Sequence, residues 1–241
     1  MNSSISNSKN PFKPYLIAYF VMLGISASLL IPNYLFLRNN GEFLSLKQIV
    51  RKQLDSKDAV IYGTAIHDDT YFYKLALCKE AKPEIVAAGS SRMLQFRKDF
   101  FTKSYVTAGG AMSSFEEGMF TLENIISNDS NLRAVLLGID FWWFNPKNKS
   151  ARMYHEPSRL SLQKLLLPFK WLREGKISFS QYLSSIVKPG PSNLIGISAA
   201  AKGSGYLSDG SYFYNQEAGV ASSRKYVGIS RKEAAEGTGK F

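Results

Sequence analysis

Two adjacent serines directly follow a short apolar run, and they are the residues of this chain best suited to nucleophilic chemistry. Ile85–Ala88 is apolar and leads into Gly89, Ser90 and Ser91. The run is typical of a buried strand, and Gly89 marks the turn that ends it. Because α/β sheets place nucleophiles and ligand contacts at the carboxyl ends of strands, the pattern favours a reactive or ligand-binding serine here.

Acyl transfer by a serine also requires a base and hydrogen-bond donors for the oxyanion. Ser91 is the candidate nucleophile, and we expect its amide and one amide of the loop 109–112 to face the developing charge. The two histidines of the chain, His67 and His155, lie in polar stretches, and neither spacing identifies a base. A plain surface histidine remains the alternative for each.

Two further apolar runs end in the same way as the first. Tyr105–Ala108 leads into two glycines, and 133–139 leads into Asp140. Between them we expect a helix over 115–127, preceded by a loop or short helix over 93–102. Strands that alternate with helices predict a mostly parallel sheet covered on both faces, with all three strand ends at one edge.

An aromatic run follows the third strand, and it has two interpretations. Trp142 and Trp143 lead into Phe144 and Asn145. The first interpretation is a buried aromatic plug over the sheet. The second is a platform beside the site that stacks on a sugar face, and the two are compatible.

Taken together, the three strand ends resemble the first three sequence blocks of the SGNH/GDSL-type hydrolase superfamily. These blocks are Gly89–Arg92, Thr107–Gly110 and Leu137–Phe141, within a resemblance that covers about residues 84–145. The resemblance is closest to the membrane-anchored branch linked to acyl modification of cell-surface polysaccharide and teichoic acid. It implies a flavodoxin-like α/β/α fold and a serine-dependent acyltransferase or esterase that needs no cofactor. The implied partners are a cell-surface glycan and a membrane-bound acyl-donor protein.

The candidate site residues fall into three groups. Ser91 is the expected nucleophile; Ser90, Gly109, Gly110, Met112 and Asp140 are expected in the oxyanion and site loops; Arg92, Trp142, Trp143 and Asn145 are expected to contact substrate. No metal ligand is expected, because no set of histidines and carboxylates shows ligand spacing.

The chain departs from the family pattern at several positions. Thr107 stands where the family has Asn, Met112 where it has Gly, and Asp140 where it has an Asn that donates to the oxyanion. An ionised Asp only accepts hydrogen bonds. The family's Asp-x-x-His block is absent, because no histidine follows His155. Three explanations of the missing block remain: the chain is a fragment, it has lost catalysis, or a partner completes it. The second functional hypothesis is a non-catalytic, membrane-tethered protein that binds glycan or a partner.

The segment 14–37 carries no charged residue and predicts a transmembrane anchor. Tyr15, Tyr19 and Tyr34 lie near its ends, as in an aromatic belt. Pro32 is expected to kink or end the helix. A cleaved signal peptide is the alternative. We expect a single-pass protein of the bacterial inner membrane with its domain on the extracytoplasmic side.

The chain is strongly basic, with 30 Lys and Arg against 19 Asp and Glu. This charge favours anionic partners such as a membrane surface, and the lack of a recognition motif argues against nucleic acid. Residues 147–188 include nine basic and two acidic residues, and the apolar residues between them are typical of an amphipathic helical hairpin interrupted at Pro168. This segment is either a solvated basic face or a surface that docks on anionic lipid.

The chain has a single cysteine, Cys78, so an internal disulfide is excluded. Cys78 is expected to be an inert thiol.

The expected organisation follows from these patterns. A disordered tail (1–13) precedes the anchor (14–37), a helical linker (38–82), an SGNH-like α/β domain (83–217) with the basic helical insertion at 147–188, and a poorly ordered tail (218–241). Helices are expected at 43–54 and 70–82, and a turn is expected at Asp209–Gly210.

Overall fold

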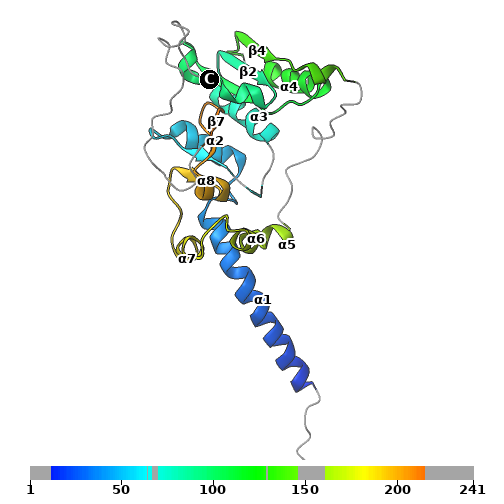
Figure 1. The fold of residues 1–241 in the computed structure, drawn as a ribbon, viewed down its shortest axis with the longest axis vertical. Helices are drawn as coiled ribbons and strands as arrows, with labels where there is room; N and C mark the ends of the chain where they lie inside the picture. Colours follow the sequence, from blue (N-terminus) through cyan, green and yellow to red (C-terminus); the bar gives the residue numbers. More distant parts are fainter. Residues whose placement is uncertain (1–11, 64, 67–69, 129, 146–160, 215–241) are drawn as a thin grey trace, which may run out of the picture.

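The protein is a mixed α/β molecule from which one long helix projects, as seen in a computed structural model (Figure 1). The structure describes residues 12–63, 65–66, 70–128, 130–145 and 161–214, so both predicted tails lie almost wholly outside the described residues. The elements, with η for a 3-10 helix, are α1 (Lys13–Asn39), α2 (Leu46–Asp55), β1 (Ile61–Tyr62), α3 (Thr70–Ala81), β2 (Ile85–Gly89), η1 (Ser91–Gln95), η2 (Lys98–Phe100), β3 (Tyr105–Gly109), α4 (Phe115–Asn128), β4 (Ala134–Gly138), η3 (Phe141–Phe144), α5 (Leu162–Leu165), α6 (Leu167–Arg173), α7 (Phe179–Val187), β5 (Leu194–Ile195), α8 (Ile197–Lys202), β6 (Gly205–Tyr206) and β7 (Tyr212–Phe213).

Helix α1 is long and apolar enough to cross a membrane. It has 27 residues, and its most apolar window has a mean hydropathy of 1.9 and is not buried in the body. The helix does not end at Pro32, as the sequence had suggested it might, but continues to Asn39. Proline removes one backbone hydrogen bond, and the buried residues Asn33, Phe36 and Leu37 hold the following turns against the body.

The junction between α1 and the body is fixed by a buried carboxylate. Glu42 accepts hydrogen bonds from the amides of Ala65, Ile66 and Ile197, the last at 2.7 Å. Burial raises the pKa of Glu42 against the opposing effect of these three donors. The end of the projecting helix is therefore rigidly tied to the loop after β1 and to the start of α8.

The sheet that carries the candidate site has the strand order β3-β2-β4 and is parallel throughout, which confirms the expected parallel arrangement. Gly89 pairs with Gly109 on one side and with Gly138 on the other, so the three strands end in one row. The chain passes from β2 to β3 and then through α4 to β4 on the opposite side of β2. The strand order therefore reverses beside β2, which is where open α/β sheets bind ligands.

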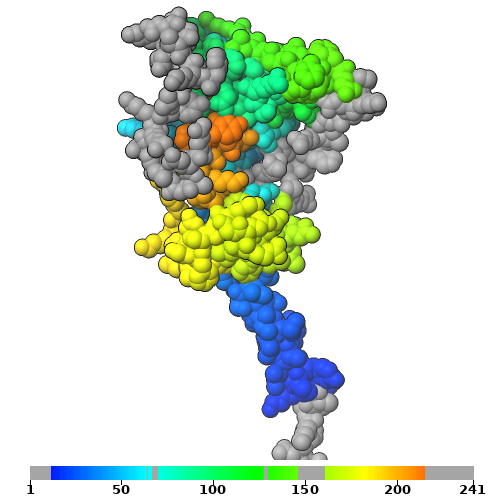
Figure 2. All heavy atoms as spheres, viewed as in Figure 1, coloured from blue at the N-terminus to red at the C-terminus, as the bar shows by residue number. Residues whose placement is uncertain are grey.

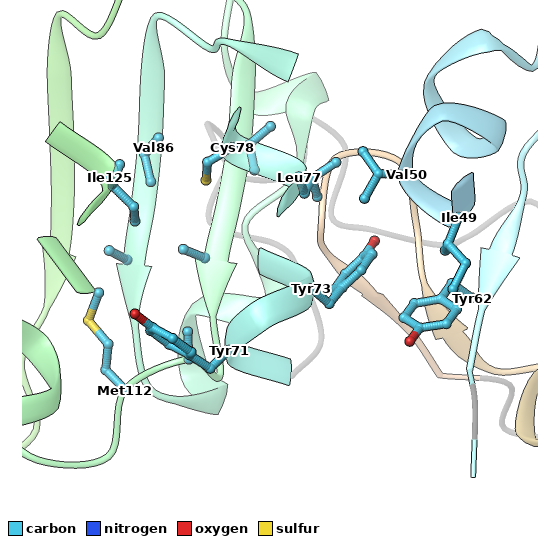
Figure 3. Packing of buried hydrophobic residues seen from close by; sticks show 14 of the residues in the cluster. Ile49, Val50, Tyr62, Tyr71, Tyr73, Leu77, Cys78, Val86, Met112 and Ile125 are labelled. Atoms are coloured by element: carbon cyan, nitrogen blue, oxygen red, sulfur yellow. The ribbon is translucent and has the colours of Figure 1, made fainter. Parts of the chain in front are cut away.

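One face of this sheet is covered by helices. Figure 3 shows Cys78 of α3 and Ile125 of α4 beside Val86 of β2, with Leu77 of α3 on the side of Val50, all in the main buried cluster. On the other face, among the described residues, Met93 of the 3-10 helix η1 and Phe101 at the end of η2 cover Ala87 and Tyr105. The described residues therefore cover one face with α-helices and the other with the short 3-10 segments, in the region where a loop or short helix was expected.

A second sheet, with the order β5-β1-β6-β7, was not predicted. Its strands have two residues each, too few to show alternation in a sequence. The predicted turn at Asp209–Gly210 is confirmed, because it connects the antiparallel strands β6 and β7. This turn also reaches the edge of the first sheet, where the Thr107 amide donates to the Asp209 carbonyl at 2.8 Å.

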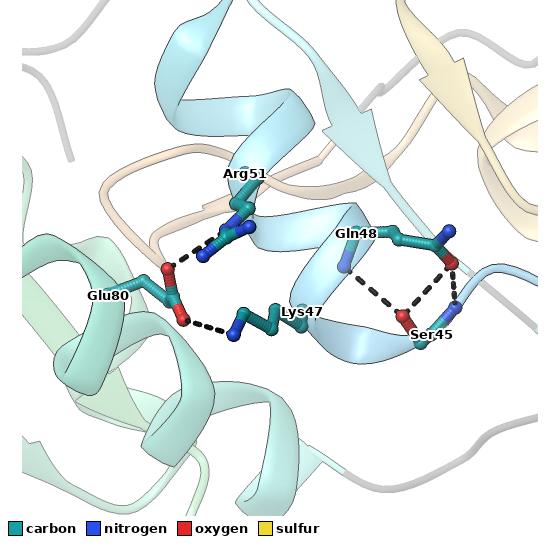
Figure 4. A network of polar contacts seen from close by, with 5 residues as sticks. All are labelled: Ser45, Lys47, Gln48, Arg51 and Glu80. Atoms are coloured by element: carbon teal, nitrogen blue, oxygen red, sulfur yellow. Dashed lines mark hydrogen bonds and ion pairs between the residues drawn. The ribbon is translucent and has the colours of Figure 1, made fainter.

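Helices α2 and α3 pack together in the segment expected to be a helical linker. Helix α2 begins at Leu46, later than predicted, because the Ser45 hydroxyl and the Gln48 side chain cap its first turn reciprocally (Figure 4). Arg51 and Lys47 of α2 both pair with Glu80 of α3, at 3.2 and 3.9 Å. Both helices contribute to the main buried cluster.

Helices α5–α7 surround α1 at the point where it leaves the body, and we call them the collar (Figure 1). The sequence predicted helices broken at Pro168, and α6 begins at Leu167 with this proline in its first turn. Proline is tolerated there because the first amides of a helix have no partner within it. Residues 147–160 of the predicted insertion lie outside the described residues.

Candidate functional site

Ser91 is the first residue of η1 and is exposed at the carboxyl end of the central strand β2. Its neighbour Ser90 is buried, and the Ser90 hydroxyl accepts a hydrogen bond from the Arg92 amide at 3.3 Å. In the part of the chain that the structure describes, no side chain makes a hydrogen bond with the Ser91 hydroxyl. Ser91 therefore lies at the strand end predicted from the sequence, and its catalytic role stays a prediction.

The tight approach of η1 to the strand ends requires glycine at two positions. Gly89 has φ +150°, and a Cβ there would lie 2.6 Å from the Gly138 carbonyl oxygen and 2.7 Å from the Met93 side chain. A Cβ on Gly109 would lie 2.6 Å from the backbone of Met93. Side chains would therefore push η1, and Ser91 with it, away from the sheet.

The loop after β3 contacts the loop after β2, but its glycine amides are already used. The Gly110 amide donates to the carbonyls of Gly89 and Ser90, both at 3.0 Å, and the Gly109 amide donates to the Thr107 hydroxyl at 3.0 Å. Thr107 itself donates to the Met93 carbonyl at 3.0 Å. These residues hold the two loops together.

The amides of Ser91 and of Met112 are the remaining candidates for an oxyanion site. The Met112 side chain is buried in the main cluster, so the loop after β3 is anchored close to its candidate donor.

Asp140 and Arg92 connect the ends of β4 and β2. Asp140 is 5% exposed, and its Oδ1 lies 3.2 Å from Arg92 Nη1. Its Oδ2 is buried without a hydrogen-bond partner among the described residues. The Arg92 guanidinium also lies over the Trp142 ring, 4.9 Å from its centre. Arg92, expected to contact substrate, therefore offsets the charge of Asp140 in this arrangement.

The aromatic run divides into a buried and an exposed part. Trp143 is 4% exposed and packs against Gly118, which confirms the interpretation as a plug for this residue. Phe141 and Phe144 are exposed, at 79% and 67%, and the half-buried Trp142 lies beside Phe141. An aromatic surface therefore exists beside Asp140, and Asn145 at its end is also exposed.

Two buried ionisable residues near the site loops were not singled out from sequence. Glu117, in the first turn of α4, accepts from the Ser113 amide and hydroxyl, both at 2.6 Å. Lys74 of α3 is fully buried and donates to the carbonyls of Thr107 and Gly210, and burial lowers its pKa to about 7. The spacing from Ser113 to Glu117 was a visible signal, whereas nothing in the sequence marks Lys74 as buried.

A pocket of about 550 Å³ lies away from this site. It lies at the amino ends of β2 and β3, where Pro83 precedes one strand and Tyr105 begins the other, and Lys98, Lys103 and Asp209 also line it. The pocket is therefore at the opposite end of the strands from Ser91.

The structure assigns no general base. His67 and His155 lie outside the described residues, and within those residues no group of three His, Cys, Asp or Glu side chains is placed to hold a metal ion. The site is therefore interpreted from its own geometry. Comparison of the chain with protein-family models, with curated proteins and with solved structures finds no match.

Proposed function

We propose that this chain is a membrane-anchored SGNH-like protein that acts in acyl transfer or ester hydrolysis on an extracytoplasmic glycan. The observation that carries the proposal is the position of Ser91, exposed at the carboxyl end of the central parallel strand, where the strand order reverses. Such a position gives a hydroxyl access to substrate while a rigid sheet holds its backbone.

The strand order supports a flavodoxin-like fold. The order β3-β2-β4 corresponds to the 2-1-3 portion of the flavodoxin-like order 2-1-3-4-5. The strand ends carry the three blocks that resemble the SGNH superfamily, and they are aligned in one row at Gly89, Gly109 and Gly138. The proposal therefore rests on agreement between motif order and register.

The chemistry would take two steps. The Ser91 oxygen attacks an acyl carbonyl, its proton passes to a base, and the protonated leaving group departs from the tetrahedral intermediate. A glycan hydroxyl or water then attacks the acyl-serine and releases Ser91. The amides of Ser91 and Met112 are the proposed oxyanion donors, and the exposed Phe141 ring with the half-buried Trp142 ring is the proposed sugar platform.

The proposed location is the bacterial inner membrane, with α1 as the span and the body outside the cytoplasm. Alkaline phosphatase fused after Phe241 is active only if it is exported, so we expect an active fusion. An inactive but stably expressed fusion would place the body in the cytoplasm and remove the glycan from the proposal.

A fluorophosphonate probe tests the nucleophile in the full chain in detergent. We expect labelling of the wild type and of Ser127→Ala, a matched change of an exposed serine on α4, and no labelling of Ser91→Ala. A folded wild type that stays unlabelled would refute the enzymatic proposal for this chain.

A non-catalytic role is the second candidate, and the Arg92–Asp140 pair favours it. This pair places a buried carboxylate beside the proposed oxyanion site, where a hydrogen-bond donor is needed. A protein that only binds glycan or a partner would keep binding to a teichoic-acid oligomer in Ser91→Ala and lose it in Trp142→Ala. Absence of binding by the folded wild type would remove the glycan from this second candidate, and binding kept in both variants would exclude the Trp142 surface as its site.

A further inference from the structure

The exposed surface of helix α7 in the collar carries an apolar ridge. On α7, Phe179, Leu183 and Val187 are spaced four residues apart, on one side of the helix, and are 65%, 47% and 78% exposed. Leu162 and Leu166 add exposed apolar surface at α5 with the same spacing. Exposed apolar side chains grouped in this way indicate an interaction surface.

The other side of α7 is fixed to α1. The Tyr182 hydroxyl donates to the Asn33 side chain at 2.8 Å, and the Asn39 side chain donates to the carbonyls of Ser185 and Ile186. These contacts set the height of the collar along α1 at residues 33–39. The ridge is therefore not free to turn inward and bury itself against α1.

The part of α1 beyond the collar has the length of a bilayer core. Lys13 to Pro32 is about 20 residues, or about 30 Å at the rise of an α-helix, which matches the hydrocarbon thickness of a membrane. Figure 2 shows α1 projecting alone directly below the collar helices. If α1 spans a membrane, the collar lies at the level of the lipid headgroups.

The charge of the collar complements an anionic surface. Residues 161–188 include five basic side chains and one acidic side chain, Glu174, which pairs with Lys176 at 2.7 Å. Lys170, Arg173 and Lys188 are exposed. Each basic residue near an anionic membrane surface contributes about 1 kcal/mol of attraction, and apolar side chains that enter the lipid add to it.

We propose that the collar is an interfacial element that lies on anionic phospholipid, with the ridge Phe179–Leu183–Val187 in the outer acyl region and the basic side chains among the phosphates. It holds the body, and with it the edge that carries Ser91, at a fixed height above the membrane. The inference rests on the membrane-anchored part of the proposed function and is independent of whether Ser91 is catalytic.

The test uses the full chain with an environment-sensitive fluorophore at one introduced cysteine. Leu183→Cys reports the ridge, Ser127→Cys reports the exposed surface of α4, and Leu23→Cys reports the projecting part of α1. Native Cys78 is buried, and unsubstituted protein carried through the same reaction gives the blank. Each variant is reconstituted in phosphatidylcholine vesicles with or without phosphatidylglycerol.

We expect brominated lipid to quench the label at residue 183 by about half in vesicles with phosphatidylglycerol, and the label at residue 127 hardly at all. Aqueous iodide should show the opposite order. Equal iodide access at residues 183 and 127 would overturn the proposal, as would equal lipid contact with and without phosphatidylglycerol. Shielding at residue 183 that rises with protein density and not with brominated lipid would assign the ridge to a second copy of the chain. Absence of lipid quenching at residue 23 would instead refute the span itself.

Discussion

The substitution Gly109→Ala tests the contact that holds the Ser91 segment on the sheet. A Cβ at this position would lie 2.6 Å from the Met93 carbonyl carbon and 2.7 Å from the Leu94 nitrogen. Carbon atoms in contact are normally about 3.5–4.0 Å apart, so η1 and β3 must separate by about 1 Å. Both atoms belong to backbone, and no side-chain rotation relieves the overlap.

The expected cost is that of overpacking a buried contact, about 1–3 kcal/mol of unfolding free energy. The displacement would also disturb the Thr107 hydroxyl, which bonds both the Gly109 amide and the Met93 carbonyl. A misplacement of about 1 Å can lower the rate of a positioned reaction about 100-fold. We therefore expect the rate of fluorophosphonate labelling of Ser91 to fall by up to about this factor in protein that is still folded.

Urea unfolding of the full chain in detergent, followed by tryptophan fluorescence, measures the first effect. Gly24→Ala is the matched control, because nothing lies within 4 Å of a Cβ there. Alanine is favoured over glycine inside a helix by about 0.5–1 kcal/mol, so this variant should be no less stable than the wild type. If Gly109→Ala is as stable as this control and is labelled at the wild-type rate, η1 does not pack on β3 as described.

Three further predictions concern other residues. Asp140→Asn replaces an acceptor with a side chain that can donate to an oxyanion, so fluorophosphonate labelling should rise about tenfold in a protein that keeps its fold; an unchanged rate would place Asp140 outside the oxyanion site. Lys74 has a pKa of about 7 when folded and 10.5 when unfolded, so the unfolded chain binds more protons between these values and stability rises with pH there. The difference in unfolding free energy between the wild type and Lys74→Met should therefore increase between pH 7 and 9, by at most about 1.4 kcal/mol per pH unit. If urea titrations give the same difference at every pH, Lys74 is not a buried amine that titrates in this range. Ser45→Ala removes the cap of α2 and should lower the unfolding free energy by about 1 kcal/mol, whereas the exposed Ser127→Ala should not; equal stability of the two variants would argue against the cap.

The parallel sheet was predictable because each of its strands is a short apolar run that ends in glycine. Those glycines have a physical cause in the structure, since Gly89, Gly109 and Gly138 form one row and η1 packs on them. The helices expected over 70–82, before Pro83, and over 115–127, after Ser113 and Ser114, are found at Thr70–Ala81 and Phe115–Asn128. In each case the signal is local, and tertiary packing reinforces it.

The second sheet and the ionic contacts of the site could not be predicted, because they depend on residues far apart in sequence. Strand β1 pairs with β5, more than 130 residues later, through registers such as Tyr62 with Ile195. The Arg92–Asp140 pair depends on β4 lying beside β2. Sequence reasoning placed Arg92 against substrate because it had no means of knowing that a carboxylate would lie at the neighbouring strand end.

This pair also bears on how the two functional hypotheses are separated. The proposed SGNH-like chemistry needs a hydrogen-bond donor after the third strand, yet Asp140 stands there and its carboxylate contacts Arg92. Arg92 is the second residue of η1, next to Ser91, so its contact with Asp140 ties η1 to the end of β4. A substrate anion that draws Arg92 away would take this partner from Asp140, whose side chain is only 5% exposed. Substrate binding through Arg92 therefore competes with the contact between Arg92 and Asp140, and the uncharged side chain of Asp140→Asn weakens that competition.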